Sequence, residues 1–269
     1  MKFIFLIIIF LFLTNCSFDN KSGIWKNEST ISNDQNEIFK EFEKISQLDS
    51  SFNKEIKFDK TFKFKISKPI TNLQWTDNYF DETNNFENFK YNDLNQLILK
   101  SKKITKYKTS KHLFFINNNI IISDERGNIN IFSLKKNKLI DKFNFYKKKY
   151  RKFKKKLNLV VKENIIYISD NIGYLYAYDL NKRKILWAKN FNVPFRSNIK
   201  VYSNKLLVAN QNNDFYFINI SNGEILKKIP TEETKINNKF INNLSIKDDV
   251  TFFLNTFGSL YALDNNKMN

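Results

Sequence analysis

Hydrophobic and polar residues alternate along much of the chain with the two-residue period of a β-strand. The stretch NIGYLYAYDLNKRKILWAKN (171–190) shows the pattern most clearly. After Gly173, tyrosines at every second position alternate with Leu175 and Ala177. A charged turn follows, and then an apolar run that contains Trp187. The pattern predicts two antiparallel strands joined by a tight turn.

This pattern occurs four times. The copies are NIIISDERGNINIFSLKKNKLIDKF, NIIYISDNIGYLYAYDLNKRKILWAKN, KLLVANQNNDFYFINISNGEILKKI and DVTFFLNTFGSLYALDNNKMN, which we place within 111–145, 157–191, 198–230 and 241–269. Their marker residues Gly127, Gly173, Asn213 and Gly258 lie 46, 40 and 45 residues apart. A β-unit of this size that recurs along a chain is typical of the blades of a β-propeller.

The residues at the turns suit tight hairpins. Glycine, or asparagine in the third copy, adopts the positive φ that such a turn demands. Asn222-Gly223 is a strong hairpin dipeptide. One equivalent position of each copy carries a short oxygen-bearing side chain that can accept a hydrogen bond from the turn, namely Ser133, Asp179, Asn219 and Asp264. We expect structural roles for all of these residues.

The segments GYLYAYDLNKRKILW and GSLYALD resemble the pyrroloquinoline-quinone-type (PQQ-like) propeller repeat, and the resemblance covers roughly residues 90–269. It implies an all-β propeller of four-stranded antiparallel blades over 56–269, with about four to five blades if 56–107 holds a degenerate one. In this family a tryptophan after the second turn often docks between blades. Trp187 matches that position, whereas Asp141 and Lys227 occupy it in two other copies. Because the family has more blades than this, we expect a truncated chain; a small closed propeller is the alternative.

The N-terminal sequence MKFIFLIIIFLFLTNC has one lysine before eleven apolar residues (3–13). At ~1.5 Å per residue, a helix of this length is too short for a hydrocarbon core of about 30 Å, so it suits the apolar region of a signal peptide. The residues LTNC (13–16) resemble the lipobox of bacterial lipoproteins, although Asn15 stands where Gly or Ala is usual. The resemblance implies a signal peptide over 1–16 and lipid attachment at Cys16, and Ser17 implies transport to the outer membrane. A signal peptide without acylation is the alternative.

Residues 17–55 are expected to connect the anchor to the propeller. The segment 17–36 is polar and lacks periodicity, as in a tether. In 37–48 the apolar residues fall on one helical face, which predicts a short amphipathic helix packed on the main domain. Glutamates on its polar face argue against a helix that lies on a membrane surface.

The net charge is +18, and lysine accounts for nearly all of the positive charge. Either AT-rich coding, which also enriches Asn, Ile and Phe, or an anionic partner would explain it. The sharpest feature is the basic run KKKYRKFKKK (147–156), which is either a solvated outer strand and loop or a contact with a membrane surface or an acidic protein. Export through a signal peptide argues against nucleic acid as the partner of this run. The residues of that contact would be Lys147, Lys148, Lys149, Arg151, Lys152, Lys154, Lys155 and Lys156.

The sequence contains no recognisable catalytic centre. PQQ-dependent dehydrogenases share the repeat, but they resemble one another in a calcium-held cofactor, an aspartate base and often an adjacent-cysteine disulfide, which a single cysteine excludes here. Asp170 lies at a turn of the repeat, and His112 has no partner at the spacing of a catalytic triad or metal site. No phosphate loop or dinucleotide fingerprint occurs. We predict no catalytic residue, no metal site and no cofactor.

Together, the lipobox and the propeller repeat resemble the BamB-type scaffold lipoproteins of the outer-membrane β-barrel assembly machinery. This resemblance implies a non-catalytic scaffold, lipid-anchored at the periplasmic face of the outer membrane, which binds protein partners of that machinery. A fragment of a quinoprotein dehydrogenase and a propeller that binds polysaccharide or other surface ligands are the alternatives.

Overall fold

A computed structural model gives the arrangement of most of the chain. The residues that it describes are 66–71, 74–86, 88–91, 96–97, 99–150, 152–232 and 241–269, together with two short strands near the N-terminus. The chain divides into two compact units, Met1–Phe64 and Lys65–Asn269.

In the first unit, strand β1 (Ser17–Phe18) pairs antiparallel with β2 (Trp25–Lys26). This short hairpin lies in the segment that the sequence assigns to a tether. The expected signal peptide (1–16) and the expected helix (37–48) lie outside the described residues.

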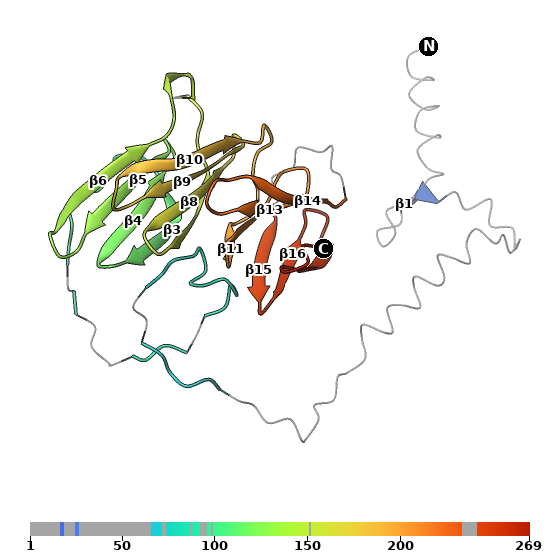
Figure 1. Cartoon of the computed structure of the whole chain (residues 1–269), viewed down its shortest axis with the longest axis horizontal. Coiled ribbons are helices and arrows are strands. Elements are labelled where there is room, and N and C mark those ends of the chain that lie inside the picture. Colours follow the sequence, from blue (N-terminus) through green and yellow to red (C-terminus); the bar gives the residue numbers. More distant parts are fainter. Residues whose placement is uncertain are drawn as a thin grey trace, which may run out of the picture. The chain divides into compact units, whose positions relative to one another are not determined.

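The second unit contains four antiparallel sheets that follow one another along the chain, coloured from green to red in Figure 1. We call them blades 1 to 4. Blade 1 consists of β3 (Thr109–Ile116), β4 (Asn119–Asp124), β5 (Asn128–Ser133) and β6 (Lys138–Asn144). Blade 2 consists of β7 (Leu157–Lys162), β8 (Ile165–Asp170), β9 (Tyr174–Asp179) and β10 (Lys184–Asn190).

Blade 3 consists of β11 (Lys200–Tyr202), β12 (Lys205–Ala209), β13 (Asp214–Asn219) and β14 (Ile225–Pro230). Blade 4 has three strands, β15 (Asn243–Lys247), β16 (Val250–Leu254) and β17 (Leu260–Asp264). In every blade consecutive strands pair as hairpins. The expected fold class is confirmed: the chain is an all-β propeller, with three four-stranded blades and one three-stranded blade among the described residues.

The described part of 66–108 is largely irregular. It contains isolated bridges, such as that between Ile70 and Phe89, and no blade. The η2 turn (Lys148–Tyr150) lies between blades 1 and 2. Among the residues that the structure describes, no helix has the length and apolar character needed to cross a membrane.

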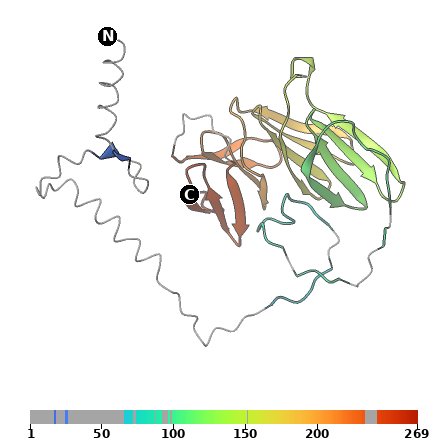
Figure 2. The same cartoon turned by 180° about the vertical axis from the view of Figure 1, so that it is seen from behind.

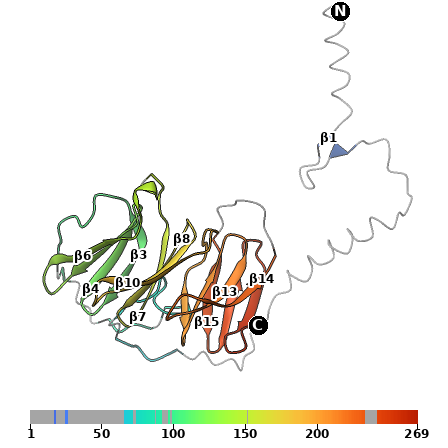
Figure 3. The same ribbon diagram turned by 45° about the horizontal axis from the view of Figure 1, so that its top comes forward.

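Neighbouring blades pack face to face through alternate residues of their strands, and their succession can be followed from two further directions in Figures 2 and 3. Because side chains alternate between the two faces of a strand, each blade has one apolar set for the blade before it and another for the blade after it. The three interfaces contain Ile121, Ile129 and Leu159 (blades 1 and 2), Leu175, Leu206 and Val208 (blades 2 and 3), and Leu207, Phe215 and Phe253 (blades 3 and 4).

Residues 75–84, which we call the strap, run along the first strand of each blade in chain order. Trp75 exchanges two backbone hydrogen bonds with Phe115 of β3, and the amide of Val161 in β7 donates to Thr76 O. In β15, the amide of Ile246 donates to Glu82 O at 2.8 Å. The strap therefore connects to the first strands of blades 1, 2 and 4 through the main chain.

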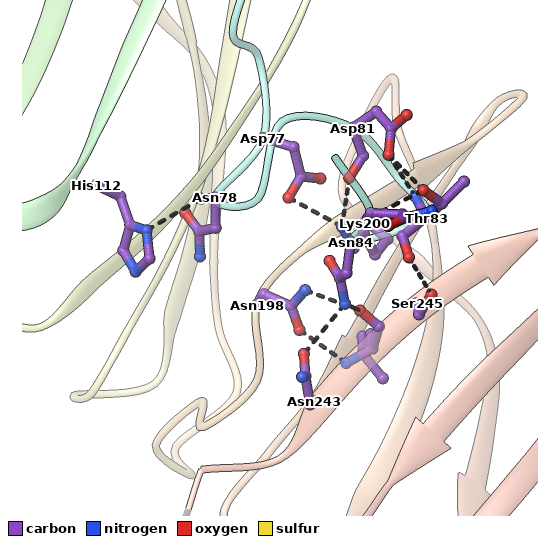
Figure 4. Close-up of polar contacts among 12 residues, drawn as sticks. Asp77, Asn78, Asp81, Thr83, Asn84, His112, Asn198, Lys200, Asn243 and Ser245 are labelled. Carbon is purple, nitrogen blue, oxygen red and sulfur yellow. Dashed lines mark hydrogen bonds and ion pairs between the residues drawn. The ribbon is translucent and has the colours of Figure 1, made fainter. Parts of the chain in front are cut away.

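Side chains complete the attachment of the strap, as the close-up in Figure 4 shows. Lys200 of β11 lies within ion-pair distance of Asp77 and donates to Asp81 O at 2.9 Å. Ser245 of β15 donates to Thr83 O at 2.7 Å. Through these contacts the strap reaches all four blades.

Candidate interaction surface

The first turn of each copy has a similar backbone conformation and similar hydrogen bonds. Its marker residues have positive φ, at 82° for Gly127, 108° for Gly173, 64° for Asn213 and 89° for Gly258. Three residues before each marker lies an aspartate or asparagine whose side-chain oxygen accepts backbone amides of the turn: Asp124, Asp170, Asn210 and Asn255. The sequence analysis singled out only Asp170 of this set, although the other three recur at the same spacing.

The side chain of Asp170 accepts more backbone amides than that of any other of these four residues. Its Oδ1 accepts the amides of Ile172, Gly173 and Tyr174, each at 2.8 Å. Its Oδ2 accepts the hydroxyl of Tyr146 at 2.6 Å. Burial raises the pKa of this carboxyl, while the hydrogen bonds from Tyr146 and the three amides lower it. The arrangement is that of a turn clamp, with all of its bonds made within the protein.

The second turn carries the other predicted residues. Asp179 Oδ1 accepts the amides of Asn181 and Lys182. Asp264 accepts the equivalent bonds from the amides of Asn266 and Lys267, and these lower its pKa. Asn219 accepts one amide, at 2.9 Å. The structure thus places these side chains within their own turns.

Trp187 joins blade 2 to blade 3. Its Nε1 donates to Ile220 O at 3.0 Å, and its ring lies against Gly223, where an added Cβ would be 2.5 Å from the ring. Asp141 occupies the equivalent position in blade 1 and accepts the hydroxyl of Tyr178 in blade 2 at 2.6 Å. Two different side chains at this position therefore contact the following blade.

Blade 4 exposes a face that the preceding blades bury. Phe252, Leu254 and Leu260 are 38%, 41% and 66% exposed, and Ala262 is exposed beside them. They belong to two paired strands, with Leu254 opposite Leu260 and Phe252 opposite Ala262. The four side chains form one apolar patch, which we call the open face.

The open face corresponds residue by residue to a buried face of blade 3. Aligning the first-turn residues Asn210 and Asn255 places Leu207, Ala209, Phe215 and Phe217 at the equivalent positions. All four are 0% exposed, because blade 4 covers them. The sequence alone does not reveal the open face, since the same apolar pattern occurs in covered and uncovered copies.

The edge of blade 4 is also open in the described residues. Strand β17 pairs with β16, whereas the equivalent strands β5, β9 and β13 each pair with a fourth strand as well. An unpaired strand edge presents backbone N–H and C=O groups that can pair with another chain. The open face and this edge adjoin, since Leu260 and Ala262 belong to β17.

The described side chains of the basic run 147–156 do not form one surface patch. Lys147, Lys148 and Lys155 line a cavity together with Arg126 and Lys142. Three other lysines of the run contact residues outside this cavity or along the run itself. Lys149 lies over the Tyr150 ring, Lys154 lies beside Glu125, and the backbone amide of Lys156 donates to Asn171. Lys152 lies in the described turn, and Arg151 lies outside the described residues.

The remaining candidates have simple surroundings. The ring of His112 lies 3.1 Å from Asn78 O, on the strap, and packs edge-on against Tyr79. Within the described part of the chain, no group of three or more His, Cys, Asp or Glu side chains is placed to hold a metal ion. Cys16, the expected lipid attachment site, lies outside the described residues.

No protein family and no curated protein matches this sequence. Among solved structures, the chain is similar to the computationally designed Ika4 protein, with a TM-score of 0.52 at 12% identity over 64% of this chain and 99% of that one. It is also similar to the designed Ika8 protein (TM-score 0.49, 12% identity, 58% and 46% of the two chains) and to BamB from Moraxella catarrhalis (TM-score 0.46, 13% identity, 57% and 45%). The match thus spans less than half of the last two chains. At these identities the similarity concerns the fold alone.

Proposed function

We propose that this chain is a non-catalytic scaffold that binds a protein partner on the open face of blade 4. The observation that carries the proposal is the contrast between Leu260, which is 66% exposed, and Phe215, which is 0% exposed at the equivalent position of blade 3. A contiguous apolar patch of this kind on a folded domain is typical of a protein interaction site. Covering one Phe or Leu side chain contributes about 1.5–3 kcal/mol.

The partner that fits this surface supplies an extended strand. Among the described residues no strand pairs with the outer edge of β17, and Phe252, Leu254 and Leu260 offer apolar contacts beside it. A strand added to β17 would satisfy the backbone groups, while an apolar sheet face would cover the patch. At the junctions within the propeller, the next blade covers this face with alternating apolar residues.

The cellular setting of the proposal comes from the sequence. We propose that Cys16 carries the lipid, that the chain faces the periplasm at the outer membrane, and that its partner belongs to outer-membrane β-barrel assembly. The resemblance of LTNC (13–16) to a lipobox and of the repeats to BamB-type scaffolds supports this setting. Client chains of that machinery are rich in β-strands and suit an open sheet edge chemically.

The test uses a urea-unfolded outer-membrane β-barrel protein that is diluted into the purified full chain. We expect complex formation, measured by light scattering and fluorescence anisotropy, and we expect Phe252→Glu with Leu260→Glu to weaken it. Ile225→Glu with Leu226→Glu is the matched control, because both residues are exposed on β14 of blade 3. No binding, or equal loss in both double variants, would exclude the open face as the docking site.

The anchor has a separate test. Mass spectrometry of the chain expressed with its own N-terminus should find an acylated Cys16 as the first residue, and Cys16→Ser should abolish membrane association. An unmodified mature chain would remove the lipid anchor from the proposal and leave the docking site untouched.

A further inference from the structure

A cavity of about 580 Å³ lies at the β4–β5 turn of blade 1, beside the η2 turn in the segment that leads to blade 2. It is lined by Tyr107, Arg126, Asn128, Lys142, Asn144, Tyr146, Lys147, Lys148 and Lys155. Cavities of this size hold small organic ligands in many proteins. The open face belongs to blade 4, so this is a second, distinct surface of the propeller.

The lining of the cavity is strongly cationic. It contains the guanidinium of Arg126 and four lysines, and none of the described residues that line it carries a carboxylate. The acidic residues nearest in sequence have other partners: Asp124 accepts hydrogen bonds from Thr105 and Asn128, Glu125 pairs with Lys154, and Asp141 accepts from Tyr178. Asp170, which lies near Lys155, accepts from Tyr146. Like charges gathered around one cavity repel one another, and an anion between them would remove that cost.

Lys155 shows that the cavity is built into the fold. This lysine is only 5% exposed, and its Nζ lies 5.1 Å from the centre of the Tyr146 ring and contacts Tyr150 O. Burial, and then the nearby charge of Arg126, lowers its pKa. The ammonium is therefore held in the fold by the Tyr146 ring and Tyr150 O, which fixes one positive charge of the cavity lining.

Gly127 makes room for this arrangement. An added Cβ would lie 2.4 Å from the Tyr146 ring and 3.3 Å from the side chain of Lys155. The marker glycine of the first repeat therefore lets the two residues lie directly against its backbone. Arg126 is held in place beside it, with its guanidinium over the Tyr107 ring at 5.4 Å.

We propose that this cavity binds a multiply charged oxyanion of the phosphate class, carried by a small ligand. Five cationic side chains would exceed the charge of a single carboxylate, whereas a diphosphate or a phosphorylated sugar matches it more closely. Lysine ammonium groups bind phosphate as point charges, and Arg126 adds a further positive charge to the lining. The same phosphate chemistry could come from a soluble ester or from a lipid headgroup.

The experiment measures binding of pyrophosphate to the full chain by isothermal titration calorimetry, and binding to vesicles of phosphatidylglycerol and phosphatidylcholine by sedimentation. The site variant is Lys142→Met with Lys148→Met, both of which are exposed at the mouth of the cavity. The control is Lys184→Met with Lys189→Met on β10, which removes the same charge from an exposed strand outside the cavity. Lys155→Met is a third variant, which removes the buried ammonium group from the cavity lining.

We expect the site variant to weaken pyrophosphate binding roughly tenfold or more, with little change in the control, because each charged hydrogen bond contributes to affinity. Loss of vesicle binding in the site variant alone would assign the phosphate to a lipid headgroup at the same cavity. Equal weakening in both double variants, or no binding of either probe, would overturn the proposal. Thermal denaturation of the site variant should match that of the wild type, which separates lost binding from lost folding.

Discussion

Lys200 Nζ lies 2.9 Å from a carboxylate oxygen of Asp77, and the two side chains are 0% and 4% exposed. Asp77 belongs to the strap and Lys200 to β11, so the pair fixes one on the other (Figure 4). Burial raises the pKa of Asp77 and lowers that of Lys200, against the attraction between the two charges. The cost of removing both charges from water offsets much of their attraction, so the pair positions the strap and adds little stability compared with an apolar pair of similar size.

Breaking this pair on one side should be costly. We expect Asp77→Asn to lower the free energy of unfolding by about 3–5 kcal/mol, because it leaves the Lys200 ammonium buried and unpaired. Asp77→Leu with Lys200→Met should recover most of that loss. Urea unfolding followed by tryptophan fluorescence measures both. Lys154→Met, which removes the mostly exposed pair with Glu125, is the control and should change stability by less than about 1 kcal/mol. A double variant as unstable as Asp77→Asn would contradict this account.

Trp187 and Gly223 should behave as one unit. Gly223 has φ of 73°, and an added Cβ would lie 2.5 Å from the Trp187 ring, whereas Gly258 has φ of 89° with nothing within 4 Å. We expect Gly258→Ala to cost about 1 kcal/mol from backbone strain, and Gly223→Ala to cost about 3 kcal/mol from strain and overlap together. In a Trp187→Leu background the Gly223→Ala cost should drop towards that of Gly258→Ala. Additive costs in this cycle would mean that the ring does not restrict the turn.

Asp170 allows a test of the turn clamp. Asn210 and Asn255 accept amides at the equivalent positions of blades 3 and 4, so asparagine has the geometry required. We expect Asp170→Asn to cost less than about 1.5 kcal/mol and Asp170→Ala about 3 kcal/mol, because alanine leaves three amides without an acceptor. Thermal and urea denaturation would show the difference. If the two variants lost the same stability, the role of Asp170 would depend on its charge and not on its hydrogen bonds to the turn.

Equivalent positions in blades 3 and 4 should respond differently to one substitution. Phe215→Ser removes a side chain that is fully buried between two blades, and it should destabilise the protein by about 3–5 kcal/mol. Leu260→Ser changes the exposed residue at the same repeat position and should change stability by less than about 1 kcal/mol. A large loss from Leu260→Ser would mean that the open face is covered in solution.

The blades were predictable from the sequence because their signals are local. Alternation along each strand, a glycine or asparagine at the turn and a regular spacing all lie within one copy, and they identified the four sheets and the turns at Gly173 and Asp179. Trp187 was singled out by the same comparison of copies. These features depend on backbone geometry that neighbouring residues determine.

The features that the sequence did not reveal depend on residues distant in the chain. The strap has no periodicity, and its contacts with β11 and β15 become visible only when the fold brings them together. Arg126 and Lys142 lie outside the basic run, yet they share a cavity with three of its lysines, while Lys149, Lys154 and Lys156 contact other residues. The exposure of Leu260 depends on what packs against blade 4, which its own sequence does not state.

The hydrogen bond from the Ile246 amide to Glu82 O affects when this propeller can finish folding. The strap leaves the ribosome before any blade, but it acquires its last hydrogen bonds only when β15 has been made. In stacked repeats each unit contacts only its neighbours, and order can spread step by step. Here the strap can complete its hydrogen bonds only after β15 has been made. Closing the long chain loop between them is slow because of its entropic cost. Final ordering of the molecule is therefore a late event that depends on both ends of the propeller at once.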